Sequence, residues 1–239
     1  MSGHSKWATT KHKKALIDAK RSASFTKLAN VVTIAARTGG DPTMNFQLRL
    51  AIDRAKAASM PKENIDRAIK RGTGELGGAA IEEIVYEGYG PSGAAILVQC
   101  LSDNRQRTVG NVRAAFSKHG GSLAESGSVA YLFEKKGQII FSLKESGRTQ
   151  EELEELIIES GADDFHTDDD TIIVYTQVSD LQSVAKFLSD AGIELESSDL
   201  TYIPKTTASI PDDKLASLEK LIDVLEGDDD VADVFANIS

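Results

Sequence analysis

The spacing of apolar residues in this sequence changes near Ile81, and that change limits the possible fold more than any other feature. Before Ile81, apolar residues recur every three or four positions, as they do along one face of an α-helix. After it, short runs rich in β-branched and aromatic residues have the length and composition of β-strands, and helical patterns alternate with them. The sequence therefore predicts an α+β protein that begins with a helical unit and continues in sheet-forming units.

Three helices are expected before the change. The first covers residues 25–36 and stops at Gly39-Gly40, the second follows a turn and cap at residues 41–43, and the third begins at Pro61 and closes at Gly72. Arg49, Arg54 and Lys56 lie on the outer face of the second helix. The apolar residues of the three helices are small, so this unit buries little area and either packs on the rest of the chain or moves relative to it.

The remaining patterns predict two α/β units, one inserted in the other. Residues 81–134 have a β-β-α-β order whose last strand is expected at 129–133, and residues 138–203 have the β-α-β-β-α-β order of a ferredoxin-like unit. The first unit has only one helix, so the apolar helix that starts near Pro211 and the tail 231–238 are expected to complete it. The predicted domains are 1–75, 76–135 together with 205–239, and the insertion 136–204.

Charge divides the chain in the same place. Residues 1–71 hold 15 Lys or Arg and 5 Asp or Glu, a net charge of +10. The whole chain has 27 Lys or Arg and 37 Asp or Glu, which leaves 12 bases and 32 acids for residues 72–239, a net charge of −20. This asymmetry predicts that the N-terminal part meets a polyanion, while the acidic remainder stays away from it or faces a basic protein.

The strongest candidate for that contact is an N-terminal basic arm, residues 2–27, which holds seven Lys or Arg and one acid, and Arg37 follows just beyond. Phosphates would take the lysines, and a base or sugar face could take the lone tryptophan. The alternative is a solubilising tail. The arm's candidate nucleic-acid-binding residues are His4, Lys6, Trp7, Lys11, His12, Lys13, Lys14, Lys20, Arg21 and Lys27.

A second candidate contact is the turn at residues 103–108, between a buried strand and a helix. Asp103 or Asn104 can cap the helix, but Arg105 and Arg107 follow where the helix dipole disfavours cations. An anion would compensate them, so Asn104, Arg105 and Arg107 are predicted to bind a phosphate or a carboxylate. A solvated loop with incidental arginines is the alternative.

Other classes of function find no support in the residues. No run of 18 apolar residues and no secretory signal is present, which favours a cytoplasmic protein without membrane insertion. The two G-x-G-x-x-G matches, at 72–77 and 88–93, lack the strand-to-helix context of a dinucleotide site and are interpreted as a linker and a hairpin. The acidic runs lack the calcium-loop pattern and are interpreted as exposed acids, and Cys100 as a small buried hydrophobe.

No Ser, Cys or Lys has a recognisable base and orienting residue, and no Cys or His pair has zinc spacing. The expectation is a non-enzymatic protein with no cofactor, no metal and no small-molecule substrate.

Several longer stretches are specific enough to suggest a family: SGHSKWATTKHKKALIDAKR, MPKENIDRAIKRGTGE, YEGYGPSGAAILVQCLSDNRQRTVGNVRAAFSKHGG and GSVAYLFEKKG. In these the chain resembles the YebC/PmpR family along almost its full length. The resemblance implies three domains, the third inserted in the second, and a non-enzymatic cytoplasmic protein. Bacterial members are described as DNA-binding transcriptional regulators, while the mitochondrial relative is a translational activator and some bacterial members are linked to ribosomes stalled on proline-rich sequences. The resemblance therefore implies a DNA-binding transcriptional regulator or, as the alternative, a ribosome-associated translation factor that binds rRNA and relieves such stalling.

The residues leave the choice between DNA and RNA open. The three expected helices contain no clear recognition helix with base-reading side chains, and a Lys/Trp/His arm suits rRNA or nonspecific phosphate at least as well as DNA. Target sequence, regulated genes and oligomeric state are not encoded in any pattern of the chain.

Overall fold

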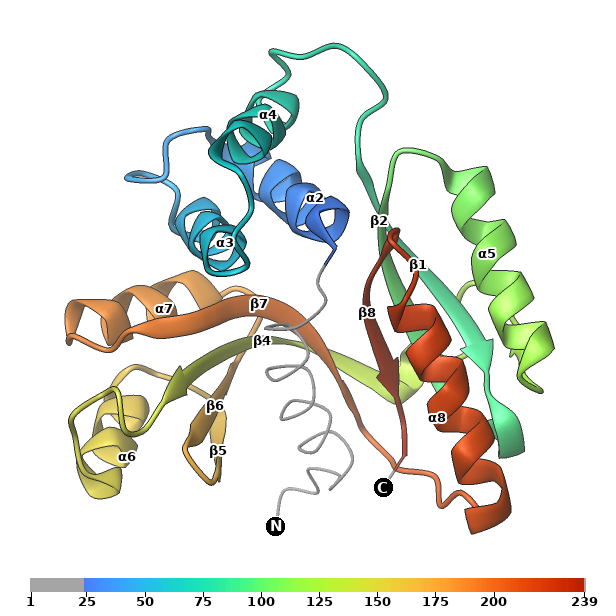
Figure 1. The fold of residues 1–239 in the computed structure, drawn as a ribbon. Helices are drawn as coiled ribbons and strands as arrows, with labels where there is room; N and C mark the ends of the chain where they lie inside the picture. The colour runs from blue at the N-terminus through green and yellow to red at the C-terminus, as the bar shows by residue number, and fades with distance from the viewer. Residues whose placement is uncertain (1–23, 239) are drawn as a thin grey trace. The chain divides into compact units, whose positions relative to one another are not determined.

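The computed structural model describes residues 24–238, which fall into two compact units (Figure 1). The first unit comprises the described residues up to Phe133 and from Pro204 onward, and the second comprises Glu134–Ile203. Both units combine helices with an antiparallel sheet, and the second is inserted in the first. The predicted α+β class and the inserted unit are confirmed. The predicted boundaries at 75, 135 and 204 stay predictions.

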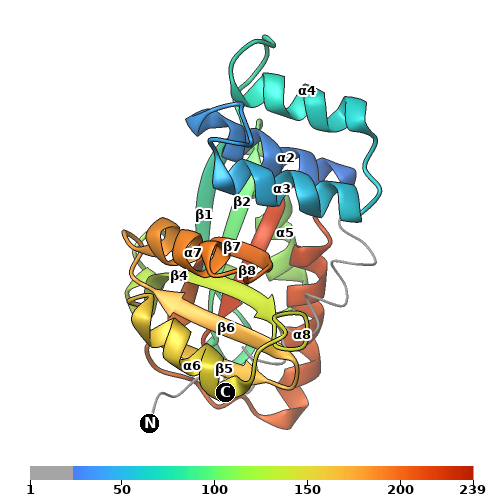
Figure 2. The same cartoon turned by 90° about the vertical axis from the view of Figure 1, so that its left-hand side faces the viewer.

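The first unit starts with three packed helices (Figure 2), and all three expected helices are present: α2 (Phe25–Ala35) followed by the 3-10 turn η1 (Ala36–Thr38), α3 (Phe46–Ala57) and α4 (Lys62–Gly72). Their core consists of small and medium apolar side chains, among them Val32, Leu48 and Ile65. The cap of α3 lies later than predicted. Asn45 accepts a hydrogen bond from the Leu48 amide, whereas residues 41–43 form only a turn.

Four strands form the sheet of the first unit in the order β3-β1-β2-β8. The strands are β1 (Glu82–Tyr89), β2 (Ala95–Ser102), β3 (Ser122–Leu123) and β8 (Val231–Ala236). The same part of the chain contains the 3-10 turn η2 (Pro91–Gly93) and the helices α5 (Arg105–Lys118) and α8 (Asp212–Glu226). Helices α5 and α8 cover one face of this sheet (Figure 1) and share one core, to which Phe116, Leu221 and Val98 belong. The C-terminal helix and strand therefore complete the first sheet.

Glycine has a packing role in the β1–β2 hairpin. Gly88 lies against the Phe116 ring, where an added Cβ would come within 2.6 Å of the ring. The G-x-G-x-x-G match at 88–93 thus joins two strands, and the match at 72–77 follows α4. Neither opens a helix after a strand, so the interpretation as hairpin and linker is confirmed.

Polar contacts hold the three helices to the sheet of the first unit. Asn30 donates from Nδ2 to the carbonyl of Leu101 at 2.9 Å, and Arg37 donates to the carbonyl of Ile81. Helices α2 and α4 approach each other closely at Gly72, where a Cβ would come within 2.3 Å of the Thr33 carbonyl oxygen. The helices therefore pack on the sheet, which is one of the two expected outcomes.

The segment before the second unit is held by a buried carboxylate. Glu87, on β1 and 5% exposed, accepts hydrogen bonds from the amides of Gly127, Val129 and Ala130 at 2.6, 2.7 and 2.8 Å. The prediction of a strand at 129–133 is wrong, because the amides of Val129 and Ala130 donate their hydrogen bonds to Glu87 and not to a neighbouring strand. The segment instead forms the 3-10 turn η3 (Ala130–Leu132), and β4 begins at Phe133.

The second unit has the predicted β-α-β-β-α-β order, with β4 (Phe133–Ser142), α6 (Gln150–Glu159), β5 (Asp164–Asp168), β6 (Thr171–Thr176), α7 (Leu181–Asp190) and β7 (Leu195–Pro204). Its sheet order, β5-β6-β4-β7, is ferredoxin-like. Ile139 and Phe141, on β4, are fully buried together with Leu153 and Leu188 of the two helices.

None of the helices between residues 24 and 238 combines the length and the apolar composition that a membrane span requires.

Candidate nucleic-acid interface

Most of the predicted arm contacts fall before the described chain. His4, Lys6, Trp7, Lys11, His12, Lys13, Lys14, Lys20 and Arg21 lie outside residues 24–238 and stay predictions. Four candidates are described: Lys27, Asn104, Arg105 and Arg107.

Lys27 lies in the first turn of α2 and is half-buried. Its Nζ donates to the carbonyl of Glu226, the last residue of α8, where the helix dipole favours a cation. Burial lowers the pKa of Lys27, and the nearby carboxylates of Glu226 and Asp229 act in the opposite direction. Lys27 therefore links two helices of the first unit, and a nucleic acid would have to compete with that contact.

Asn104 caps α5. Its Oδ1 accepts from the Arg107 amide at 3.0 Å, and its own amide donates to Ser102 Oγ at 3.0 Å. Of the two residues that could cap this helix, Asn104 does so, because the Asp103 carboxylate is engaged elsewhere: it pairs with Arg107 at 3.1 Å and with Arg71 of α4 at 3.0 Å. The hydrogen bond from Arg71 lowers the pKa of Asp103 against the effect of burial.

Arg107 binds a carboxylate of its own chain. Its Nε and Nη2 donate to the two carboxylate oxygens of Asp230 at 2.9 and 2.7 Å, a bidentate pair that raises the pKa of Arg107. Asp230 also accepts from Thr108 Oγ1 at 2.9 Å. Burial alone would raise the pKa of Asp230, but the hydrogen bonds from Arg107 and Thr108 lower it. The anion that compensates Arg107 is therefore internal.

Asp230 was missed by sequence reasoning. The run Asp228–Asp230 was expected to consist of exposed turn acids, and Asp229 is exposed, but Asp230 is only 6% exposed. Its partner Arg107 is 123 residues away, and no local pattern joins them. The signal that could have found the pair is the position of Asp230 directly before a buried strand, combined with an arginine excess at the start of a helix.

Arg105 is the part of this turn that can still take an anion. Its side chain is exposed, and residues 24–238 supply no ion-pair partner for it. Its backbone carbonyl accepts from the Tyr86 hydroxyl at 3.3 Å, which fixes the start of α5 against β1. A phosphate here would meet one free guanidinium and a helix N-terminus.

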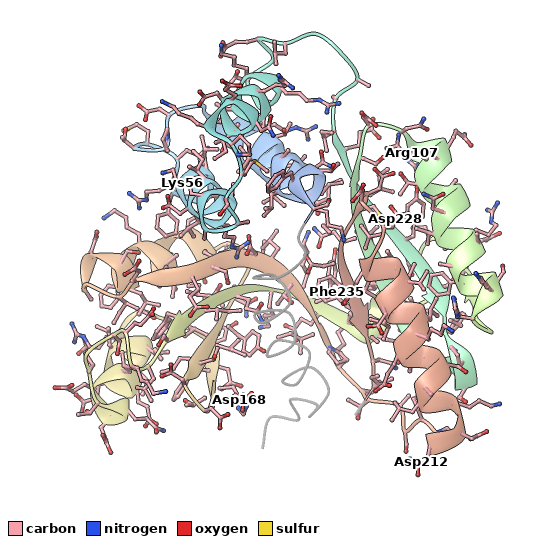
Figure 3. All side chains as sticks on the ribbon, in the orientation of Figure 1. Lys56, Arg107, Asp168, Asp212, Asp228 and Phe235 are labelled. Atoms are coloured by element: carbon pink, nitrogen blue, oxygen red, sulfur yellow. The ribbon has the colours of Figure 1, made fainter. Side chains whose placement is uncertain are left out.

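The three-helix part of the first unit adds a basic surface that the predicted site left out. Residues 24–72 hold nine Lys or Arg and four Asp or Glu. Lys56, which is labelled in Figure 3, and Arg49 are exposed on α3, as predicted, whereas Arg54 is half-buried. On α4, Lys62, Arg67 and Lys70 are exposed, but Glu63 and Asp66 alternate with them.

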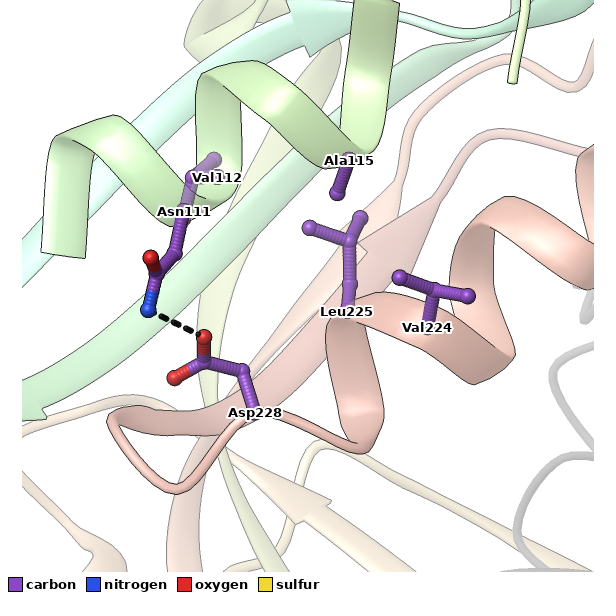
Figure 4. Close-up of a pocket in the computed structure, with 6 residues that line it drawn as sticks. All are labelled: Asn111, Val112, Ala115, Val224, Leu225 and Asp228. Atoms are coloured by element: carbon purple, nitrogen blue, oxygen red, sulfur yellow. Dashed lines mark hydrogen bonds between the residues drawn. The ribbon is translucent and has the colours of Figure 1, made fainter. Parts of the chain in front are cut away.

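Two hollows of the first unit lie near the turn after α8. One, of about 40 Å³, is lined by Asn111, Val112, Ala115, Val224, Leu225 and Asp228, and in it Asn111 Nδ2 donates to Asp228 at 2.8 Å (Figure 4). The other, of about 430 Å³, is lined by Thr26, Arg107, Asn111 and Asp228–Asp230. The first has a mostly apolar lining but is far smaller than a ligand pocket, and the second is lined by polar and charged residues rather than by the apolar residues of a small-molecule site. Among the described residues, no group of three or more His, Cys, Asp or Glu could hold a metal ion.

Cys100 is buried on β2, as expected. Burial raises the pKa of its thiol to about 12, so the reactive thiolate is not populated at neutral pH.

Comparison with known proteins decides the family. Residues 5–75 match the family described as "TACO1/YebC protein N-terminal domain", and residues 81–238 match "TACO1/YebC second and third domain". The chain belongs to the TACO1/YebC family. The resemblance in the sequence motifs is thereby confirmed.

Full-length relatives agree with this assignment. A "Probable transcriptional regulatory protein" of Persephonella marina is 52% identical over 99% of this chain and 95% of its own, and one of Pelotomaculum thermopropionicum is 49% identical over 99% and 98%. A crystal structure titled as a conserved hypothetical protein from Aquifex aeolicus superposes with a TM-score of 0.85 at 45% identity, covering 98% of this chain and 97% of that one. The TACO1/YebC fold thus extends over the whole described chain.

Proposed function

We propose that this TACO1/YebC protein is a non-enzymatic regulator of transcription that binds DNA through its N-terminal basic arm and the adjoining helices. The observation that carries the proposal is the separation of charge: residues 1–71 have a net charge of +10 and residues 72–239 a net charge of −20. The negative charge of residues 72–239 repels a polyanion, so we expect residues 1–71 to make the contact with DNA. The regulatory names of the relatives from Persephonella marina and Pelotomaculum thermopropionicum support the same role.

The test measures how DNA affinity depends on salt. Replacing Lys11, Lys13 and Lys14 with Ala should weaken binding uniformly across sequences and reduce the slope of log K against log salt by about 2 to 3, near one for each phosphate that is no longer neutralised. The matched control replaces three lysines of the acidic part, Lys118, Lys144 and Lys220, and changes the net charge equally. An equal slope change in both variants would mean that only total charge matters, and no change in the first would remove the arm from the interface.

A second candidate function is a ribosome-associated factor that binds rRNA, and the exposed face of α4 favours it. That face alternates Lys62, Glu63, Asp66, Arg67 and Lys70, a mixed pattern that does not suit a helix that reads bases in the major groove. On this alternative the α5 turn would contact rRNA phosphate through Arg105.

The variant for that test is Arg105→Ala alone, because replacing Arg107 as well would break its pair with Asp230. If the protein binds ribosomes, Arg105→Ala should weaken co-sedimentation with them and leave binding to a short DNA duplex intact. Arg113→Ala, exposed on the same helix, is the control. A wild-type protein that fails to sediment with ribosomes at physiological salt, yet binds one duplex sequence at least about 1000-fold better than random DNA, would exclude the ribosomal alternative.

A further inference from the structure

Met44, in the loop between α2 and α3, is the most exposed large apolar side chain of the described chain, with 87% of its surface open to solvent. Single exposed apolar residues are common and need no explanation by themselves. The loop that carries Met44 is unusual, however, because its backbone is held on both sides of the exposed residue.

Hydrogen bonds fix the loop before and after Met44. Asp41 Oδ1 accepts from the Thr43 amide at 2.9 Å and from the Thr43 hydroxyl at 2.7 Å. Asn45 donates from Nδ2 to the carbonyls of Ala35 and Gly39 at 2.7 and 2.8 Å. The loop is therefore preformed: its own hydrogen bonds hold it in the conformation that exposes Met44.

Met44 also lacks the packing that its position usually provides. Asn45 is the cap of α3, so Met44 precedes the cap, and an apolar residue there often packs on the fourth residue of the helix. Here the fourth residue is Arg49, whose guanidinium lies over the Phe46 ring at 5.0 Å from its centroid. Within residues 24–238, the Met44 side chain is thus left exposed.

We infer that Met44 is an apolar wedge that contacts the face of an unstacked base in DNA, while Arg49 beside it contacts a phosphate. A thioether packs well on aromatic rings, and methionine is among the residues that proteins insert between base steps. This inference rests on the proposed function, and it adds base contact to the phosphate contacts of the arm.

The charge around the loop favours nucleic acid over an apolar protein groove. Residues 24–72 hold nine bases against four acids, and Arg49 and Lys56 are exposed on the helix that follows the loop. Asp41, the acid closest to Met44 in the sequence, stays negatively charged, since hydrogen bonds from Thr43 lower the pKa of its carboxyl, but the bases of residues 24–72 outnumber the acids. Met44 therefore projects from a basic surface, which suits a phosphate-lined partner.

The experiment uses the full chain and a DNA duplex with one unpaired 2-aminopurine, whose fluorescence rises when the base is unstacked. Met44→Ala should lower the affinity about 2- to 10-fold, because alanine loses the apolar contact with the base, and it should remove the rise in fluorescence. The salt slope should not change, because every phosphate stays neutralised as in the wild type. Arg49→Ala should instead reduce that slope by about 1.

Two further variants complete the test. Met44→Leu should restore most of the affinity, since it keeps an apolar side chain of similar size, and Ile158→Ala, which removes another exposed apolar side chain, should have no effect. Wild-type affinity and fluorescence in Met44→Ala would overturn the wedge and leave DNA binding intact. A lower salt slope in Met44→Ala would also overturn it. Failure of the wild-type protein to bind this DNA, or a response only with the matched RNA, would overturn the DNA assignment together with the proposed function.

Discussion

Replacing Glu87 by Gln should destabilise the first unit, although the two side chains have nearly the same size. One carboxylate oxygen accepts from the amide of Gly127, and the other accepts from the amides of Val129 and Ala130. A glutamine has one acceptor oxygen and one NH₂ group, so in either orientation at least one amide faces another donor. An unsatisfied buried group costs about 1 to 3 kcal/mol, and we expect Glu87→Gln to lose that amount and Glu87→Ala about 3 to 5 kcal/mol.

Acid should remove this difference. Burial by itself raises the pKa of Glu87, but the three backbone amides outweigh it and hold the pKa below its ordinary value of 4.5. A carboxylate with a lowered folded-state pKa stabilises the protein above its unfolded-state pKa, and the contribution is lost as the pH falls through the folded value. The stability gap between wild type and Glu87→Gln should therefore be full at pH 7 and narrow below about pH 4.5.

Urea unfolding measures the gap, and hydrogen exchange locates it at the amides of Gly127, Val129 and Ala130, which should exchange faster in the variant. Glu83→Gln is the matched control, because Glu83 lies on the same strand but is exposed and accepts a hydrogen bond from a side chain, Gln99 Nε2 at 2.9 Å. Equal stability of Glu87→Gln and Glu83→Gln at pH 7, or a gap that persists unchanged in acid, would refute the reasoning.

Two other predictions concern packing and charge in the first unit. Gly72→Ala should destabilise this unit by about 1 to 3 kcal/mol, because the new methyl group would meet the Thr33 carbonyl oxygen at 2.3 Å. Gly110→Ala, inside α5, is the control: its new methyl group meets nothing within 4 Å, so urea unfolding should show neutral or increased stability. Asp230→Asn should cost about 1 to 3 kcal/mol by replacing one of the oxygens that hold Arg107, and a urea midpoint equal to that of Asp229→Asn would contradict the proposed importance of the pair.

Local patterns were sufficient to predict the helices and the class of the fold. Helix α6 has the place expected in the β-α-β-β-α-β order, and its start carries a local signal: Thr149 and Glu152 form a capping box. The strand expected at 129–133 failed because Glu87, about 40 residues earlier, takes its amides. A side chain that acts across the fold leaves no periodic signal.

The candidate site follows the same division. Charge counts are sums over the sequence, so the basic N-terminal part could be predicted without a structure. The role of Arg107 could not, because its partner Asp230 comes from the far end of the chain. Met44 was not singled out either, since only the fold shows that Arg49 packs on Phe46 and leaves Met44 exposed.

The place of β8 in the sheet has a consequence for biosynthesis. Strand β8 (Val231–Ala236) pairs with β2 (Ala95–Ser102), a central strand whose side chains are nearly all buried, yet β8 is synthesised well after β2 and after the whole second unit. The second unit, Glu134–Ile203, can fold while translation continues. Until β8 has been synthesised, however, the edge of β2 that pairs with β8 stays unpaired and exposed. A nascent chain stopped before residue 231 would keep that edge exposed, so chaperones that bind apolar strands can bind β2 until β8 has been synthesised.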